Sequence, residues 1–103
     1  MFDGDSGFIR CFGSKGDKDG EFLRPTGIAI DTQGRLIVAD RDNHRIQVLL
    51  ESGEFYTKFG SKGDHESDLN DTHGVAVLSD GKIAAADFRN NRIQIFLVVA
   101  EEE

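Results

Sequence analysis

The sequence predicts an all-β protein built from two copies of one four-stranded unit, because a long pattern of residues occurs twice. The segment 12–17 returns as 59–64, 47 positions later, and no insertion breaks the register between residues 2 and 95. A period in the forties, with short apolar runs between Gly and Asp turns, is the length of one β-propeller blade. We therefore expect two blades, each with two apolar faces that need neighbours.

Composition limits the kind of protein further. The chain has 103 residues, 38% of them hydrophobic, which suits one domain or part of one. Its single cysteine, Cys11, excludes an internal disulfide framework and a Cys-based zinc site. The net charge of −7 works against nonspecific binding to nucleic acid or acidic membranes. With no long apolar stretch and no signal peptide at its start, the chain is expected to be cytoplasmic and to make no membrane contact.

Each repeat is expected to contain four strands, named a to d in chain order. In the first copy they are residues 27–31, 35–40, 45–50 and 54–59, and Pro25 lies in the connection before strand a. Alternation in strand c puts Ile46 and Val48 on one face, and in strand d we expect Phe55 and Phe59 to point inward. The second copy repeats this pattern at 74–77, 82–87 and 92–96.

The alignment of the copies also sets the order of strands along the chain. Residues 8–12 align with strand d at 55–59, so the chain is expected to open with a lone strand d and to run d-abc-d-abc. We divide it into a first repeat at 1–48, which includes strand d of a preceding blade, a second repeat at 49–96, and an end with an acidic tail at 97–103. Two blades cannot close a ring. The missing blades are expected from the rest of a longer chain or from self-association, in which three copies joined head to tail give six blades.

The best-preserved segments resemble the NHL repeat almost position for position. They are PTGIAID at residues 25–31, GRLIVAD at 34–40 and NHRIQV at 43–48, and the second copy has NNRIQI at 90–95 without the His and without the preceding Pro. The resemblance implies a six-bladed propeller. In this respect the chain is similar to the C-terminal propellers of tripartite-motif proteins, some of which bind RNA or partner proteins. It is also similar to the propeller of the peptide amidating lyase.

One group of polar residues recurs in both copies around the turn between strands b and c. An Asp at the end of strand b can accept backbone N–H bonds and pair with Arg, while Asn tolerates the left-handed conformation of such turns. Because the group occurs once in each blade, we interpret it as a structural turn network rather than a binding site. Its members are Asp40, Asn43 and Arg45, repeated as Asp87, Asn90 and Arg92.

Metal and enzyme sites are not predicted. Residues 17–21 resemble the first half of a calcium loop, but no Glu follows at the required distance and the sister loop lacks the Gly. His44, His65 and His73 lie on different loops without a spacing that would bring them together. We therefore expect no metal and no cofactor, and a metal-dependent, lyase-type enzyme is the least favoured function.

Connectivity places the d-to-a and b-to-c loops on one side of the blades. This loop face comprises residues 14–26, 40–45, 61–73 and 87–92, with eight Lys and Arg against ten Asp and Glu and a net charge of −2. The family resemblance makes it the usual recognition face. Its charge balance disfavours RNA, because affinity for RNA comes largely from neutralised phosphates.

The leading hypothesis is a non-enzymatic recognition module that binds a protein or peptide through the loop face. The alternative is single-stranded or stem-loop RNA on the same residues, with aromatic rings stacking on bases and arginines meeting phosphates. The candidate contacts are the exposed polar and aromatic residues of the face: Arg24, Arg41, His44, His73, Phe88 and Arg89.

Overall fold

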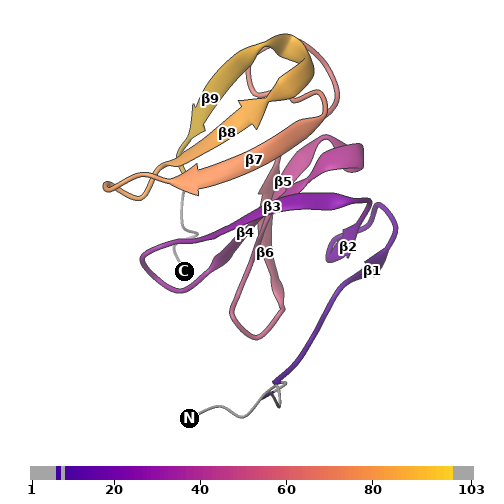
Figure 1. The fold of residues 1–103 in the computed structure, drawn as a ribbon, viewed down its shortest axis with the longest axis vertical. Helices are drawn as coiled ribbons and strands as arrows, with labels where there is room; N and C mark the ends of the chain where they lie inside the picture. The colour runs from indigo at the N-terminus through magenta and orange to yellow at the C-terminus, as the bar shows by residue number, and fades with distance from the viewer. Residues whose placement is uncertain (1–6, 8, 99–103) are drawn as a thin grey trace.

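Two antiparallel sheets pack against each other in the computed structural model, which describes residue 7 and residues 9–98 (Figure 1). Blade 1 is a four-stranded meander of β3 (Pro25–Ile30), β4 (Leu36–Asp40), β5 (Arg45–Leu49) and β6 (Phe55–Phe59). Blade 2 is a three-stranded meander of β7 (Thr72–Val77), β8 (Ile83–Asp87) and β9 (Arg92–Phe96). The prediction of an all-β chain made of propeller blades is confirmed.

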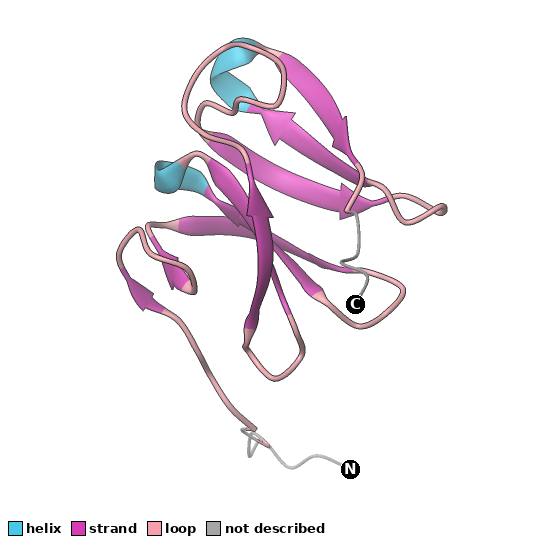
Figure 2. Ribbon diagram, turned by 180° about the vertical axis from the view of Figure 1, so that it is seen from behind, coloured by secondary structure: helices cyan, strands magenta, loops and turns pink. Residues whose placement is uncertain are grey.

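Short turns join the strands of each blade. Between β4 and β5 the chain forms one 3-10 turn, η1 (Arg41–Asn43), and η2 (Phe88–Asn90) repeats it between β8 and β9 (Figure 2). In the β3–β4 hairpin, the Asp31 carboxylate accepts hydrogen bonds from the backbone N–H of Gln33 at 2.9 Å and from Arg35 Nε at 2.6 Å. Such local bonds fix the turn residues without help from the core.

The loops before strand a contain a small parallel element that the sequence did not predict. In the first copy β1 (Ser14–Lys15) pairs with β2 (Glu21–Phe22), and in the second copy a single parallel bridge joins Lys62 and Leu69 at the matching positions. The element closes each d-to-a loop onto itself, which gives both loops the same shape.

The core lies between the two blades. Ile37, Val48, Ala39 and Ile46 of blade 1 share one face by register and are all fully buried. They pack with Ile83, Ala85 and Leu69 from the other blade and its loop. The strands nearest each other are β3 and β7, and a Cβ at Gly27 would lie 3.0 Å from the His73 carbonyl oxygen. Glycine therefore permits the close approach of the two blades at this point.

Two details of the predicted strands are wrong. Pro25 is the first residue of β3 and not part of the connection, a position that proline tolerates, and a bulge follows it before Gly27. In β6, Tyr56 and Phe59 pack against the core cluster, whereas Phe55 was expected to do so. A register shift between Val48 and Leu49 leaves one extra residue in β6, which exchanges the faces of the residues beyond it.

The expected lone strand d at residues 8–12 is not formed in the part of the chain that the structure describes. Phe8 lies outside the described residues, and residues 9–12 are exposed and have no strand partner. Arg10 Nη1 instead donates to the Glu51 carbonyl at 3.0 Å, and Phe12 lies against Gly53, so the segment runs beside the β5–β6 hairpin. The edge strands β6 and β9 of the two described blades do not pair with this segment. The repeat limits 1–48, 49–96 and 97–103 stay a prediction.

No helix within residues 9–98 is long and apolar enough to cross a membrane.

Candidate recognition site on the loop face

A buried aspartate at the end of β4 ties the loop face of blade 1 to its sheet. Asp40 is fully buried. Its Oδ2 accepts from Arg45 Nε at 2.7 Å and from Asn43 Nδ2 at 3.0 Å, and its Oδ1 accepts from the Leu23 N–H at 2.8 Å. The other two nitrogens of the Arg45 guanidinium donate hydrogen bonds to backbone carbonyls of the d-to-a loop, at 2.8–3.0 Å. The charges of Asp40 and Arg45 thus neutralise each other inside the protein and are not offered to a ligand.

Blade 2 repeats this network. Asp87 Oδ2 accepts from Arg92 Nε at 2.6 Å and from Asn90 Nδ2 at 3.0 Å, and Oδ1 accepts from the Asn70 N–H at 2.7 Å. Burial raises the pKa of Asp87, but the bonds from Asn90 and Arg92 outweigh it, and the pKa is lowered overall. The six residues interpreted as a turn network thus lie in two matched sets of contacts.

Sequence reasoning missed one member of each network, and it assigned the left-handed backbone conformation to the wrong residue of each turn. Gln47 and Gln94 donate to Asp40 and Asp87 at 3.2 and 3.3 Å, and their repetition 47 positions apart was the available signal. Asn43 and Asn90 do not adopt the left-handed conformation. His44 and Asn91 do, at φ 54° and 57°, because each follows the 3-10 turn as its C-cap.

The candidate contact residues gather around Asp71, which sequence reasoning did not select. Asp71 lies just before β7 and is only 6% exposed. Its carboxylate accepts from Arg41 Nε at 2.6 Å and from Arg89 Nε at 3.2 Å, and its N–H donates to His44 Nδ1 at 2.9 Å. The Asp71 cluster, as we use the term, consists of Arg41, His44, Asp71, His73, Phe88 and Arg89.

The electrostatics of the cluster hold Asp71 ionised. The pKa of Asp71 is lowered to about 2, mainly by the hydrogen bond from Arg41 and also by the bond from Arg89, against the opposing effect of burial. The bond between Arg41 and Asp71 in turn raises the pKa of Arg41. An ionised carboxylate between two guanidinium groups fixes their orientation, so both arginines are held in place on the loop face.

Phe88 and Arg89 give the cluster its exposed surface. The Phe88 ring stacks on His73 at a centroid distance of 4.4 Å, and Phe88 remains 53% exposed. The Arg89 side chain is 64% exposed, and within the described residues only its Nε makes a hydrogen bond. An apolar ring and a cation with unused donors therefore lie side by side, which suits recognition of a ligand with an apolar and an acidic group.

Arg24 is the one candidate contact outside the Asp71 cluster. It pairs with Asp42 at 3.0 Å, and Asp42 lies 3.9 Å from Arg41, so Arg24 borders the cluster. Arg24 and Asp71 occupy the same repeat position, as do Asp42 and Arg89, so the two blades have the same ion pair with its charges exchanged. This exchange at matched positions was the signal in the sequence that pointed to Asp71.

The histidines are placed differently from the expectation. Loop spacing suggested that none would meet, yet His44 and His73 both adjoin Asp71, with His73 Nε2 3.6 Å from its Oδ2. Both histidines reach Asp71 because the loops that carry them pack together across the blade interface. His65 lies apart, exposed beside Asp64 and Asp68. Among the described residues, no group of three or more His, Cys, Asp or Glu has the arrangement of a metal site.

The packed meanders, with one Asp-centred turn network each, define two blades of a β-propeller. Comparison with protein families matches the NHL repeat at residues 22–49 and 69–96, which together make up more than half of the chain. The chain belongs to the NHL-repeat family, as the resemblance of residues 25–31, 34–40 and 43–48 suggested.

Several named proteins are similar to parts of the chain. Protein lin-41 of Caenorhabditis elegans is 50% identical over 52 residues, which are 50% of this chain and 4% of that protein. E3 ubiquitin-protein ligase TRIM71 of Gallus gallus is 53% identical over 47 residues, 46% of this chain and 5% of that protein. Protein brain tumor of Drosophila melanogaster is 46% identical over 44 residues, 43% of this chain and 4% of that protein. The chain thus matches a small part of each relative, and the ligase activity in the second name describes that whole protein.

Proposed function

We propose that this chain is a non-enzymatic recognition module that binds an extended protein or peptide segment at the Asp71 cluster. The carrying observation is the pairing of a half-exposed aromatic ring with an oriented, exposed guanidinium at Phe88 and Arg89. The fitting ligand has an acidic side chain or a terminal carboxylate for Arg89 and an apolar side chain for Phe88. Arg24, at the border of the cluster, supplies a second exposed cation.

The internal use of charge supports a peptide over RNA. Arg45 and Arg92 are committed to the turn networks, and Arg41 is committed to Asp71, so three cations counted on the loop face are already neutralised. RNA binding requires several cations that gain phosphates as partners. One observation favours RNA as a second candidate, because a half-exposed Phe88 beside Arg89 can also stack on a base.

A peptide display experiment tests the proposal. A random-sequence peptide library is selected on the immobilised chain, and enriched peptides are measured by fluorescence anisotropy. We expect acidic residues next to apolar ones, and at least a tenfold loss of affinity, about 1.4 kcal/mol, for Phe88→Ala and for Arg89→Ala. Lys82→Ala is the matched control, since Lys82 pairs with Asp80 on the β7–β8 hairpin outside the loop face.

RNA is tested in parallel with a pool of random single-stranded oligonucleotides in filter binding across a salt series. No retention, or retention independent of salt, supports the peptide proposal. A log–log slope of about −0.7 for each phosphate contact, abolished by Arg89→Ala, contradicts it and assigns the face to RNA.

We further propose that the two blades work within a larger ring, whose other blades come from copies of this chain or from the rest of a longer one. The support is that both blades have one face covered by the other blade and one face open. A cytoplasmic location remains part of the same proposal.

A further inference from the structure

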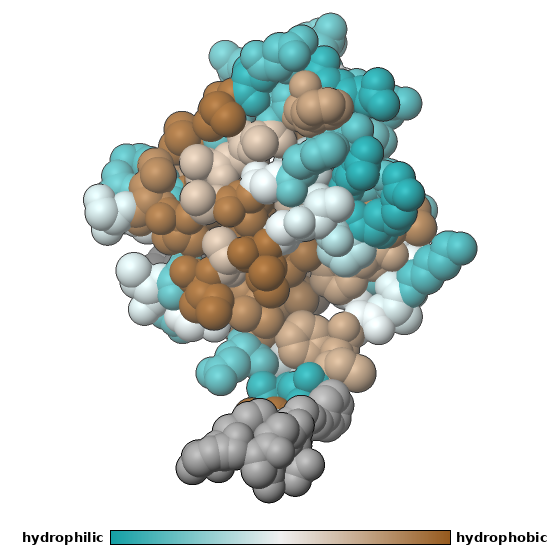
Figure 3. Space-filling view, viewed as in Figure 1, coloured by the Kyte–Doolittle hydropathy of each residue, from teal (hydrophilic) through white to brown (hydrophobic). Residues whose placement is uncertain are grey.

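Each blade leaves one apolar face without a partner in the described chain. On blade 1, the hairpin face away from the core carries Ile28 at 63% exposure and Ile30 at 64%. On blade 2, β9 carries Ile93 at 65% and Ile95 at 52%. We call these surfaces the outer face of blade 1 and the outer face of blade 2. Figure 3 shows apolar residues gathered over the centre and one edge of the molecule.

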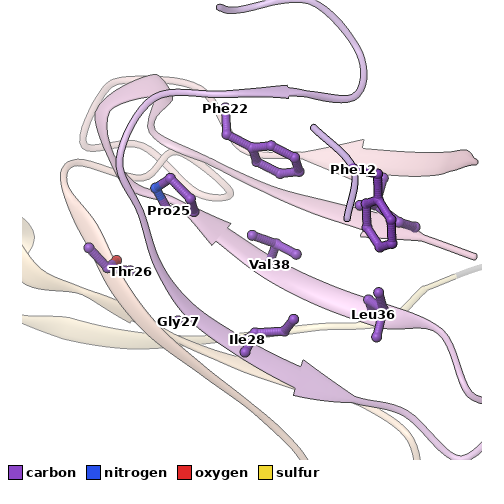
Figure 4. A pocket seen from close by; sticks show the side chains of 9 residues that line it. Phe12, Phe22, Pro25, Thr26, Gly27, Ile28, Leu36 and Val38 are labelled. Atoms are coloured by element: carbon purple, nitrogen blue, oxygen red, sulfur yellow. The ribbon is translucent and has the colours of Figure 1, made fainter. Parts of the chain in front are cut away.

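The outer face of blade 1 is hollow. A cavity of about 410 Å³ opens on it, with Val38 at its centre and the rings of Phe22 and Phe12 at its rim (Figure 4). Ile28 and Leu36 complete its floor. The lining is almost entirely apolar. Because removing apolar surface from water lowers the free energy, an apolar occupant of the cavity is favoured over water.

The occupant can be inferred from the repeat, because the same hollow exists once more in the molecule and is filled there. Moving 47 positions along the chain converts six of the nine lining residues of the cavity into residues of the core cluster. Phe12 becomes Phe59, Phe22 becomes Leu69, Ile28 becomes Val75, Leu36 becomes Ile83, Val38 becomes Ala85 and Leu49 becomes Phe96. In the core, this set is covered by Ile37, Ala39, Ile46 and Val48 of the neighbouring blade. The surface that fits the hollow is therefore the matching face of an NHL blade.

The outer face of blade 2 is that matching face. Ala39 and Ile46 correspond to Ala86 and Ile93 without change, and Ile95 stands where the core has Val48. Register places these residues together on one side of the β7–β9 sheet. The chain thus exposes both halves of an interface that it already forms once internally.

The differences between the two surfaces compensate. Ile37 of the core corresponds to Ala84 on the outer face of blade 2, a loss of three side-chain carbons. On the opposing side, Val38 in place of Ala85 adds two carbons and Ile28 in place of Val75 adds one. Phe22 in place of Leu69 and Leu49 in place of Phe96 cancel, and Ile95 in place of Val48 leaves the open pair of faces one carbon larger than the packed pair. Cores tolerate exchanges that conserve total volume, so the open pair of faces can reach the density of the packed pair.

Glycine supplies an independent sign that a strand approaches the outer face of blade 2. Gly27 lies against the next blade, where a Cβ would meet the His73 oxygen at 3.0 Å and the Gly74 Cα at 3.2 Å. Gly74 occupies the same repeat position, yet nothing lies within 4 Å of a Cβ built on it. In the matching interface, its neighbours would be the Thr26 oxygen and Gly27 Cα of a second copy.

We propose that the outer face of blade 2 binds the outer face of blade 1 of a second copy of this chain, head to tail. The interface is heterologous, so it leaves one face open at each end until a ring closes. This inference deepens the larger ring proposed above and names the two surfaces that form it. It does not depend on the peptide site, which lies on the loop face.

A mixing experiment tests the proposal. Ile93→Asp blocks one face and Ile28→Asp blocks the other, and both positions are more than half exposed, so the fold of each variant should survive. By sedimentation velocity we expect each variant alone to be a monomer. An equimolar mixture should form a dimer, because the intact face of one variant matches the intact face of the other. Far-ultraviolet circular dichroism checks that both are folded.

Gly74→Ala is a second variant that keeps the chain intact and still tests the contact. Since its Cβ meets nothing within the chain, we expect an unchanged fold and a loss of association of tenfold or more. Phe88→Ala is the control, because it should weaken peptide binding at least tenfold and leave the mass unchanged, which separates this inference from the recognition function. A mixture that stays monomeric, or a Gly74→Ala chain that associates like the unmodified one, overturns the proposal.

Discussion

Asp71 shows how a single residue organises the loop face. It is shared by Arg41 and Arg89 at 2.6 and 3.2 Å and is nearly buried, so its ionised form is part of the folded state. Unlike Asp40 and Asp87, it has no acidic counterpart in the other blade, where Arg24 occupies the position. A residue that differs between two otherwise matched blades is a candidate for a function particular to one of them.

The lowered pKa of Asp71 predicts a defined dependence on pH. Its pKa is about 2 in the fold against an ordinary value of 3.8, so the stability it contributes is complete above about pH 4 and is lost as the pH falls toward 2. Chemical unfolding at a series of pH values should show a difference between the unmodified chain and Asp71→Asn that is largest above pH 4 and shrinks toward pH 2. A difference that stays constant over this range would contradict the assignment.

Arginines of the turn networks and arginines of the Asp71 cluster should differ in how much they contribute to stability. Arg45 is bonded to the fully buried Asp40, so Arg45→Ala leaves a buried carboxylate unpaired and should cost about 3 kcal/mol or more of unfolding free energy. Arg89→Ala removes a largely exposed side chain and should cost about 1 kcal/mol or less. Urea denaturation measures both. Equal losses would refute this division, and Arg92→Ala, the counterpart of Arg45, should resemble Arg45→Ala.

Much of the residue-level account could be predicted where the two copies agree. The Asp–Asn–Arg networks recur at the same positions, and repetition marks them as part of the scaffold. For Asp71, the sequence marks only the position, through the exchange of charge with Arg24, because its role depends on contacts between loops of different blades. The left-handed residues were misassigned for a local reason, since the 3-10 turn extends over Asn43 and transfers the strained conformation to His44.

At the scale of elements, the predicted strands b and c agree closely with β4 and β5, because their apolar runs end at clear turn residues. The start of β3 at Pro25 and the side of β6 that faces the core were harder to predict from the sequence. Both depend on bulges, at Pro25/Gly27 and at Val48/Leu49, that change the faces of residues without leaving a mark in the composition. Tyr56 and Phe55 are both aromatic, so the pattern alone could not choose between them.

The close approach of β3 and β7 predicts that two equivalent glycines differ in their tolerance. Gly27→Ala places a methyl group 3.0 Å from a backbone oxygen of the other blade, which should cost about 1–3 kcal/mol through overpacking. Gly74→Ala meets nothing in the same chain and should melt like its parent. Thermal melts of both variants in the Ile93→Asp background, where association is blocked, make the comparison. Equal melting temperatures would contradict the packing described for the two blades.

The whole molecule is one complete blade interface flanked by two halves of another. Its loop face carries the proposed recognition site, and its two outer faces carry the proposed joints of a ring. The sequence period predicted that faces would be left open. The match between those faces could be argued only after the structure had shown which residues pack in the internal interface.

The mass of the unmodified chain in solution shows whether the two outer faces join copies of the chain into a ring. Light scattering coupled to gel filtration, over a range of concentrations, measures it without any substitution. We expect a particle of three times the 11.4 kDa chain mass, with a melting temperature that rises with concentration. A monomer of 11.4 kDa at all concentrations, with a single cooperative melt, would contradict this expectation.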